Sequence, residues 1–155
     1  MHIANPAPVL REIVRVVKPG GRVVAVEPDL ELVLIDSGMA DVTRKVLAIQ
    51  ADAYNNASIG RQLHGLFSQT GLIDAHAVPQ IMAIPDATTL ETTLRLFSLA
   101  HAGVANGAFS RYEASTWEED LLTKDRADVF SCYAVMFTAH GRVSDRLGDQ
   151  LECTN

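Results

Sequence analysis

The chain has 155 residues, of which 48% are hydrophobic and 21% charged, and these values fit one compact globular domain. Its formal net charge of −6 argues against a nucleic-acid-binding or anionic-membrane surface, because both need clustered basic side chains. The sequence has only two cysteines, Cys132 and Cys153, and neither a signal peptide nor an apolar run of about 18 residues. We therefore expect a cytoplasmic protein without a disulfide framework or a membrane span.

Residues 8–29, PVLREIVRVVKPGGRVVAVEPD, predict a helix, a tight turn and a strand in immediate succession. Pro8 suits the first turn of a helix, and apolar residues then recur at helical spacing along one face. A Pro-Gly-Gly sequence ends the helix, since it permits the positive φ of a sharp reversal. The apolar run at 22–27 predicts a parallel strand that is covered on both faces and ends at a Glu-Pro-Asp sequence.

The rest of the chain predicts four helices and two further strands. LELVLIDS, at 30–37, is expected to be a short loop or turn of helix. Helices are expected at 41–55, at 58–70, from Thr88 and from Ser110, with an interrupted or bent edge strand at 72–84 and an interior antiparallel strand at 129–140. The last two helices open with predicted capping boxes, Thr88 to Glu91 and Ser110 to Glu113. The loop 102–108 between them is either a hinge, through Gly103 and Gly107, or a plain turn, and residues 144–155 read as a frayed polar tail.

The helix, turn and strand resemble the second half of a class I S-adenosylmethionine-dependent methyltransferase, of the type that includes the ubiquinone and menaquinone biosynthesis enzymes (methyltransferase type 11/25-like). Those proteins carry a His and an Asn/Asp-Pro pair, then a helix with the pattern vLrE..RvlkPGGr, then an apolar fifth strand. The matching residues here are His2, Asn5, Pro6, Leu10, Arg11, Glu12, Arg15, Val16, Val17, Lys18, Pro19, Gly20, Gly21 and Arg22.

The resemblance continues along the chain to about residue 143. Residues 60–79 resemble the family's last large helix and sixth strand, and 129–143 resemble its seventh strand. This implies an α/β fold: the C-terminal part of a Rossmann-like three-layer sandwich, with strands 5, 6 and 7, flanking helices and a helical lid or insertion at about 86–124. The domain would span residues 1–143.

The resemblance also implies S-adenosylmethionine as cofactor and a small molecule as methyl acceptor. However, none of the ten glycines forms G-x-G-x-G or G-x-G-x-x-G, and the family's cofactor loop would lie upstream of Met1. We therefore expect the N-terminal half to be absent and the chain to be inactive alone, as a truncated or split protein. The alternative is a non-catalytic remnant that forms a homodimer through its exposed fifth strand, because an unpaired apolar edge invites strand pairing.

Three residues are candidates for the site. Glu27 and Asp29 follow the carboxyl end of a strand, where open α/β sheets bind ligands, so either can orient or deprotonate an acceptor. The alternative roles are a turn carboxylate and a helix cap. By the resemblance, His2 matches the position beside the methionine moiety of the cofactor in a complete domain.

Two other kinds of site are not expected. Cys132 and His140 lie eight residues apart on one strand, which separates them by about 26 Å at about 3.3 Å per residue and excludes a nucleophile–base dyad. His64, His76 and His101 lie on separate elements without short ligand spacing, so we expect no metal site.

Three aromatic side chains form the last candidate group. Trp117, Phe97 and Tyr112 either pack in the core or line a pocket for an apolar or aromatic acceptor.

Overall fold

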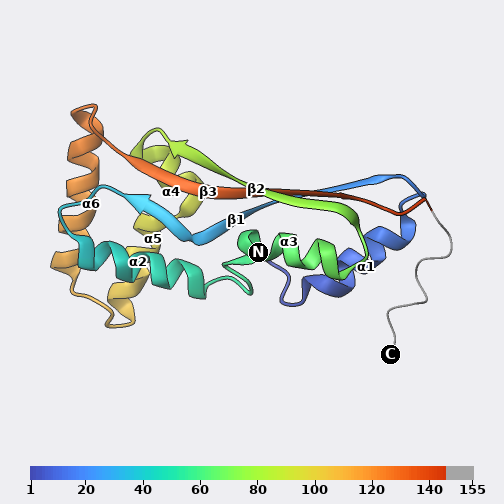
Figure 1. The fold of residues 1–155 in the computed structure, drawn as a ribbon. Helices are drawn as coiled ribbons and strands as arrows, with labels where there is room; N and C mark the ends of the chain where they lie inside the picture. The colour runs from blue at the N-terminus through green and yellow to red at the C-terminus, as the bar shows by residue number, and fades with distance from the viewer. Residues whose placement is uncertain (146–155) are drawn as a thin grey trace.

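The structure is a computed structural model that describes residues 1–145, in which six helices accompany a three-stranded antiparallel sheet (Figure 1). The α/β class expected from the sequence is therefore confirmed for this part of the chain. The strands are β1 (Arg22–Ile35), β2 (Ile73–Ile84) and β3 (Cys132–Arg142). The helices are α1 (Pro6–Val16), α2 (Ala40–Asp52), α3 (Ile59–Gln69), α4 (Ala87–Leu94), α5 (Leu96–Ala105) and α6 (Arg111–Arg126).

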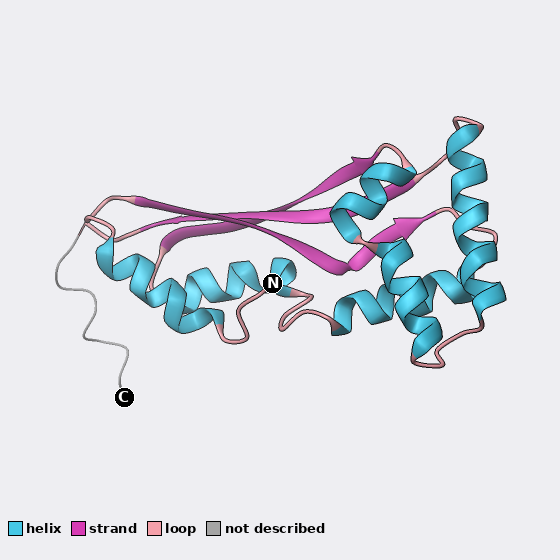
Figure 2. Ribbon diagram, turned by 180° about the vertical axis from the view of Figure 1, so that it is seen from behind, coloured by secondary structure: helices cyan, strands magenta, loops and turns pink. Residues whose placement is uncertain are grey.

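β3 occupies the centre of the sheet, between β1 and β2, and runs antiparallel to both. Figure 2 shows the three long strands twisting together along the length of the molecule. The expectation of an interior antiparallel last strand is confirmed. Because β3 is the only sheet neighbour of β1 among the described residues, the outer edge of β1 has no partner strand there.

The helices form two groups at opposite ends of the sheet (Figure 1). The first buried cluster packs α2, α4, α5 and α6 against one end of the sheet and includes Cys132 and Ala134 of β3. The second packs α1 and α3 against the opposite end and includes Ala139 of β3. Even- and odd-numbered residues of a strand point to opposite faces. The two ends of β3 thus bury opposite faces of the twisted sheet, and half of each face is left without helices.

α1 and the glycine turn match the prediction from the sequence. Gly20 has a φ of +74°, which favours glycine. α1 buries only Leu10, which belongs to the second cluster. Val9, Ile13 and Val16, spaced for one side of the helix, are 41%, 39% and 62% exposed. An apolar stripe of α1 therefore faces solvent.

β1 differs from the prediction, because it continues through the expected stop at Pro28 and Asp29 to Ile35. The expected loop or helical turn at 30–37 is wrong. Residues 30–32 instead bulge out of the ladder between Asp29, opposite Val135, and Val33, opposite Ala134. A proline is tolerated at this position because β1 is an edge strand.

The expectation that the apolar run of β1 is covered on both faces is also wrong for the described residues. Val23 is buried, but Val24 and Val26 are 61% and 54% exposed. The helices α1 and α3 cover only the face to which Val23 points. β2 fits the expectation of an edge strand, since it passes through Pro79 without interruption.

The segment predicted as a single helix from Thr88 forms two helices. Asp86, rather than Thr88, caps α4, by accepting a hydrogen bond of 2.6 Å from the Thr89 N–H. Arg95 adopts a left-handed conformation, with φ of 57°, and breaks the helix. The Glu91 carboxylate then accepts hydrogen bonds from the backbone N–H groups of Phe97 and Ser98, at 2.8 and 3.3 Å. The predicted Thr88–Glu91 capping box is thus wrong because Glu91 caps the next helix.

Of the other predictions for this region, the structure confirms one and contradicts another. The Ser110–Glu113 capping box is confirmed. The hinge is wrong at Gly103, which lies within α5, where an added Cβ would come within 2.6 Å of Phe109 Cζ. Gly107, with a φ of +72°, forms the turn before α6. Of the tail predicted at 144–155, residues 146–155 lie outside the described residues, and so does Cys153.

Candidate functional site

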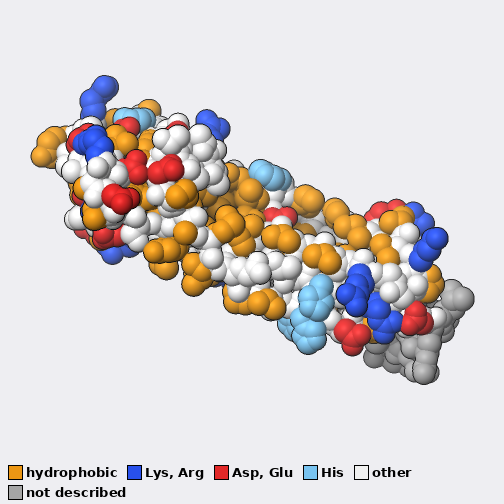
Figure 3. Space-filling view, turned by 90° about the horizontal axis from the view of Figure 1, so that it is seen from above, with side chains coloured by type: hydrophobic (Ala, Val, Ile, Leu, Met, Phe, Trp, Pro, Cys, Tyr) orange, Lys and Arg blue, Asp and Glu red, His pale blue; other side chains and the backbone are white. Residues whose placement is uncertain are grey.

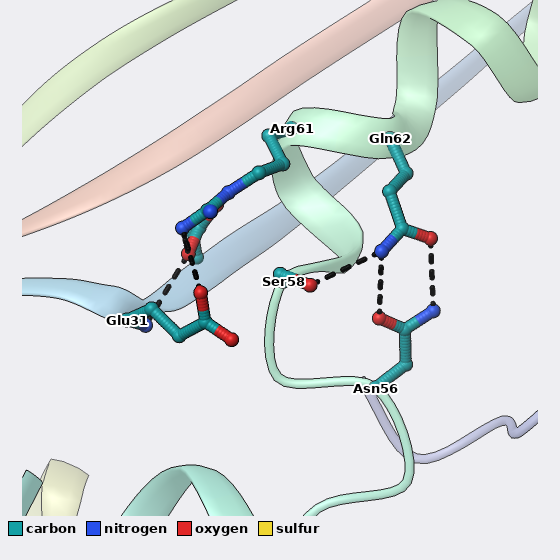
Figure 4. Close-up of polar contacts among 6 residues, drawn as sticks. Glu31, Asn56, Ser58, Arg61 and Gln62 are labelled. Atoms are coloured by element: carbon teal, nitrogen blue, oxygen red, sulfur yellow. Dashed lines mark hydrogen bonds and ion pairs between the residues drawn. The ribbon is translucent and has the colours of Figure 1, made fainter. Parts of the chain in front are cut away.

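A polar cluster that includes a buried carboxylate joins the bulge of β1 to the start of α3 (Figure 4). The Asp29 side chain is fully buried, and both Nε and one terminal nitrogen of Arg61 donate hydrogen bonds to its carboxylate, the latter at 2.7 Å. The Glu31 N–H also donates to Asp29, at 3.2 Å, and the Glu31 carboxylate lies 3.2 Å from Arg61. The pKa of Arg61 is raised, mainly because Asp29 accepts its hydrogen bonds.

Arg61 reaches Asp29 because α3 begins directly against β1. A Cβ on Gly60 would lie 2.7 Å from Phe137 Cδ2 and 2.9 Å from the carbonyl oxygen of Pro28. Only glycine allows this approach without displacing the helix or the strand.

The loop before α3 is fixed by its own side chains (Figure 4). The Gln62 and Asn56 amides form two reciprocal hydrogen bonds of 3.2 Å, and Gln62 also donates to the Ser58 hydroxyl at 3.1 Å. The position of Arg61 is therefore set by both packing and polar contacts.

Glu27 lies beside the first residues of the chain. The amino group of Met1 pairs with its carboxylate at 2.7 Å, and the Asn56 N–H donates to the Met1 carbonyl at 3.1 Å. The Asn55 amide donates to the His2 carbonyl at 2.7 Å, and the rings of His2 and Tyr54 lie 5.4 Å apart. The structure thus brings the segment carrying His2 to the carboxyl-end region of the predicted strand.

The two candidate carboxylates have different environments. Asp29 is fully buried and held by Arg61, so it cannot accept a proton from a substrate without breaking that pair. The Glu27 side chain is 33% exposed. The sequence could not distinguish them, because Arg61 lies 32 residues from Asp29.

Three surface hollows lie away from both carboxylates. One, of about 530 Å³, is lined by residues of α6, including Tyr112 and Asp120. The others, of about 160 and 380 Å³, lie beside Arg142 and beside Met39. None of these three is lined by Glu27 or Asp29.

Of the three aromatic candidates, two lie in the core and one lies on the surface. Trp117 is fully buried, donates to the Thr43 hydroxyl at 2.9 Å, and meets the ring of Phe97 edge-on at 5.8 Å. Tyr112 is 77% exposed. Core packing is thus the observed role of Trp117 and Phe97, which do not form a pocket with Tyr112.

The structure keeps Cys132 and His140 apart, as predicted, near opposite ends of β3. Burial raises the pKa of the Cys132 thiol to about 11, which keeps it protonated at neutral pH. His101 lies 2.8 Å from Glu118. No group of three or more His, Cys, Asp or Glu side chains suited to a metal ion occurs within residues 1–145.

Sequence spacing missed one histidine pair. His76 and His140 are directly opposite on β2 and β3, and their ring centroids lie 5.6 Å apart. Only the strand register reveals this pair.

Among the described residues, no helix is both long enough and apolar enough to cross a membrane. No known family model matches the sequence. A curated relative, the "Uncharacterized 37.1 kDa protein in transposon TN4556" of Streptomyces fradiae, is 30% identical over 139 residues. These residues make up 89% of this chain but 40% of the relative, so the chain spans about two fifths of the relative's length.

Two solved structures are similar over 94% of the chain. One is Haemonchus contortus phosphoethanolamine N-methyltransferase 2 in complex with phosphomonomethylethanolamine and S-adenosylhomocysteine, with 18% identity, a TM-score of 0.38 and 31% of that chain covered. The other is a proposed sarcosine dimethylglycine methyltransferase from Galdieria sulphuraria, with 17% identity, a TM-score of 0.31 and 50% covered. Both scores are low, so we base the functional proposal on the residues of this chain.

Proposed function

We propose that this chain is the C-terminal part of a class I S-adenosylmethionine-dependent methyltransferase that acts on a small-molecule acceptor. The observation that carries the proposal is the order of the first elements. Helix α1, which resembles the methyltransferase helix, and its glycine turn lead directly into β1, whose outer edge is unpaired within the described residues. The interior, antiparallel position of β3 supports the proposal, because the resemblance assigns this strand as the seventh.

The surface around β1 supports a requirement for further polypeptide. Val24 and Val26 are more than half exposed on the uncovered face, and Val16 of α1 is 62% exposed. Exposed apolar groups beside an unpaired strand edge favour association with another strand and its flanking elements. We infer that such a segment would supply the glycine-rich cofactor loop, and that the chain alone is inactive.

The geometry favours distinct roles for the candidate residues. Asp29 is a positioning residue that holds β1 and α3 together through Arg61. Glu27 is the better candidate to orient or deprotonate an acceptor, because its carboxylate is partly exposed. His2 would contact the cofactor side in a complete domain, and the helices within 86–124 would form the lid. Methyl transfer requires mainly the alignment of donor and nucleophile, so one general base is the only catalytic side chain that the reaction would need.

Calorimetric titration with S-adenosylmethionine tests the proposal on two proteins, this chain and the longer Streptomyces fradiae relative. We expect binding by the relative and no measurable binding by the chain. Tight, stoichiometric binding to the chain alone would contradict a missing cofactor half. No binding by the relative would contradict the methyltransferase assignment.

The alternative function is self-association through β1, and the contrast between the two sheet edges favours β1 as the contact. β2 carries Pro79, which has no N–H to donate, and its pairing is irregular around Asp74, whose φ is 55°, whereas Arg22–Val26 is a regular edge with exposed valines. Two copies would pair β1 with β1.

Sedimentation measurements on two matched variants test this alternative. Val24→Lys adds a charge on the face beside the free edge of β1, and Val78→Lys adds one at a similarly exposed position of β2. Self-association through β1 predicts a dimer for the wild type and Val78→Lys but a monomer for Val24→Lys. At about 100 μM protein, a dimer with a dissociation constant of a few μM would be well populated, so a monomeric wild-type chain at this concentration would exclude self-association through β1.

A further inference from the structure

The uncovered face of the sheet carries one unusual arrangement of side chains. His76 on β2 and His140 on β3 are cross-strand partners, both exposed, with ring planes inclined by 51° and centroids 5.6 Å apart. Figure 3 shows histidine side chains gathered on this face beside basic and acidic groups. Neither histidine has a role in the proposed methyltransferase function.

We propose that His76 and His140 form a two-histidine chelate for a first-row transition-metal ion of the Zn²⁺, Ni²⁺ or Cu²⁺ class. Directly opposite residues of an antiparallel pair have Cβ atoms about 4.5–5.5 Å apart, so both imidazoles can turn toward one point above the sheet. Bonds of about 2.0–2.1 Å in tetrahedral geometry place two ligand nitrogens about 3.4 Å apart. Both side chains are exposed, so small rotations of the two rings can bring the nitrogens to this separation.

The surroundings determine which ions this site selects. In the same row of the sheet, Val24 of β1 lies opposite His140 and offers no competing polar group. In the adjacent row lie Arg22 and Arg142, which are themselves opposite one another. These two cations repel any divalent ion, and Mg²⁺ and Ca²⁺ would in addition lack the oxygen ligands that they require. Imidazole nitrogens suit Zn²⁺, Ni²⁺ and Cu²⁺.

One carboxylate shares a hollow with His140. Asp74 and His140 line the same hollow of about 160 Å³, together with Arg22 and Arg142. The Asp74 carboxylate lies 3.6 Å from Arg142, which also pairs with Asp145 at 2.5 Å. Because Asp145 can retain Arg142, Asp74 is available to balance the charge of a bound ion. The other coordination positions face solvent and would hold water.

The chelate would connect an edge strand to the centre of the sheet. β2 pairs only with β3 among the described residues, and a shared ion would join the two strands independently of their backbone ladder. An ion that binds only the folded arrangement stabilises it by mass action. We therefore expect added Zn²⁺ to raise the thermal midpoint of the chain.

Calorimetric titration of the full, untagged chain with ZnCl₂ and with NiCl₂ tests the proposal. We expect one ion per chain, and at least a tenfold loss of affinity in each of His76→Gln and His140→Gln. The matched control is His64→Gln, an exposed histidine on α3, which should bind as the wild type does. CaCl₂ should give no binding.

Acid provides a second readout. Only neutral imidazole binds a metal ion, so affinity should also fall as the solution is acidified, and Arg22, Arg142 and Asp74 are the charged groups that line the hollow with His140. Unchanged affinity in both histidine variants would overturn the proposal, as would one ion per two chains. Retained folding of the variants, measured by circular dichroism, separates loss of the site from loss of structure.

Discussion

Asp29 and Arg61 join the bulge of β1 to the first turn of α3 through a two-point ion pair in which the Asp29 side chain is fully buried and the Arg61 side chain is 43% exposed. This asymmetry matters because the two partners lose different amounts of hydration on folding. The carboxylate depends on Arg61 for its charge balance. Arg61 can still contact water and Glu31 without Asp29.

Arg61→Met should therefore destabilise the protein more than Asp29→Asn. The first substitution leaves a buried carboxylate without its cation, which costs about 2–4 kcal/mol, whereas the second keeps the shape of the side chain and costs about 1–2 kcal/mol. Urea denaturation of both variants measures the difference. Equal losses, or a larger loss for Asp29→Asn, would mean that burial of the carboxylate does not dominate this pair.

The close approach of α3 to β1 predicts opposite effects for two glycines of the same helix. Gly60→Ala should destabilise the protein by about 1–3 kcal/mol, because its Cβ would lie 2.7 Å from Phe137 and 2.9 Å from the Pro28 carbonyl. Gly65→Ala meets nothing closer than 4.0 Å and should stabilise by about 0.5–1 kcal/mol through helix propensity.

Thermal and urea unfolding of the two alanine variants decide this. Equal losses of stability in both variants would contradict the predicted contact with β1, because helix propensity favours alanine over glycine at both positions. A third variant, Gly60→Ser, should behave like Gly60→Ala, since both add a Cβ at the same point.

Short-range signals along the chain predicted much of this fold. Helical spacing located the helices, the Ser110–Glu113 pair located a helix start, and the mixed apolar and aromatic composition of 129–140 indicated an interior strand. Each of these signals depends on residues within a few positions of one another. Such local preferences therefore survive in the folded chain.

The wrong predictions have a common cause, which is that distant residues override local ones. Pro28 ordinarily marks the end of a strand, but β1 continues because its bulge buries Leu30 in the first cluster and pairs the Leu30 N–H with the Ala57 carbonyl at 2.9 Å. Glu91 looked like half of a capping box, and only the break at Arg95 places its carboxylate at the start of α5.

The pairs that define the candidate sites were also unreadable from the sequence. Asp29 and Arg61 meet through a helix packed on a strand, and His76 and His140 meet through strand register. No spacing rule connects such positions. Glu27 and His2 could be selected only from the end of a strand and from family resemblance.

Burial of Cys132 predicts a thiol that does not react in the folded protein. Its pKa is raised to about 11 because desolvation disfavours the thiolate, which is the reactive form. In the variant Cys153→Ser, a thiol reagent at pH 8 should modify Cys132 no faster than the protein unfolds. In about 6 M urea, where small domains are unfolded, modification should be complete. Rapid modification without urea would show that this end of β3 opens readily.

The capping box of α6 predicts part of the loss of stability in acid. The backbone N–H and hydroxyl of Ser110 donate to Glu113 and hold the pKa of its carboxyl below the ordinary value. Because the folded pKa is lowered, this contribution is fully present above the ordinary glutamate pKa, about 4.3, and is lost as the pH falls through the folded value. Glu113→Gln removes the charge and should flatten the dependence of the thermal midpoint on pH below about 4.5.

Ser110→Ala provides the complementary test at the same helix end. Without the hydroxyl donor, the pKa of Glu113 should move part of the way back toward its ordinary value, so the loss of stability in acid should be smaller than in the wild type. The cap itself contributes about 1 kcal/mol at neutral pH, so the midpoint of Ser110→Ala should also be lower there. Identical pH profiles for the wild type, Glu113→Gln and Ser110→Ala would show that other carboxylates control the loss of stability in acid. Asp86 would then be the next residue to replace, because the Thr89 N–H lowers the pKa of its carboxyl at the start of α4.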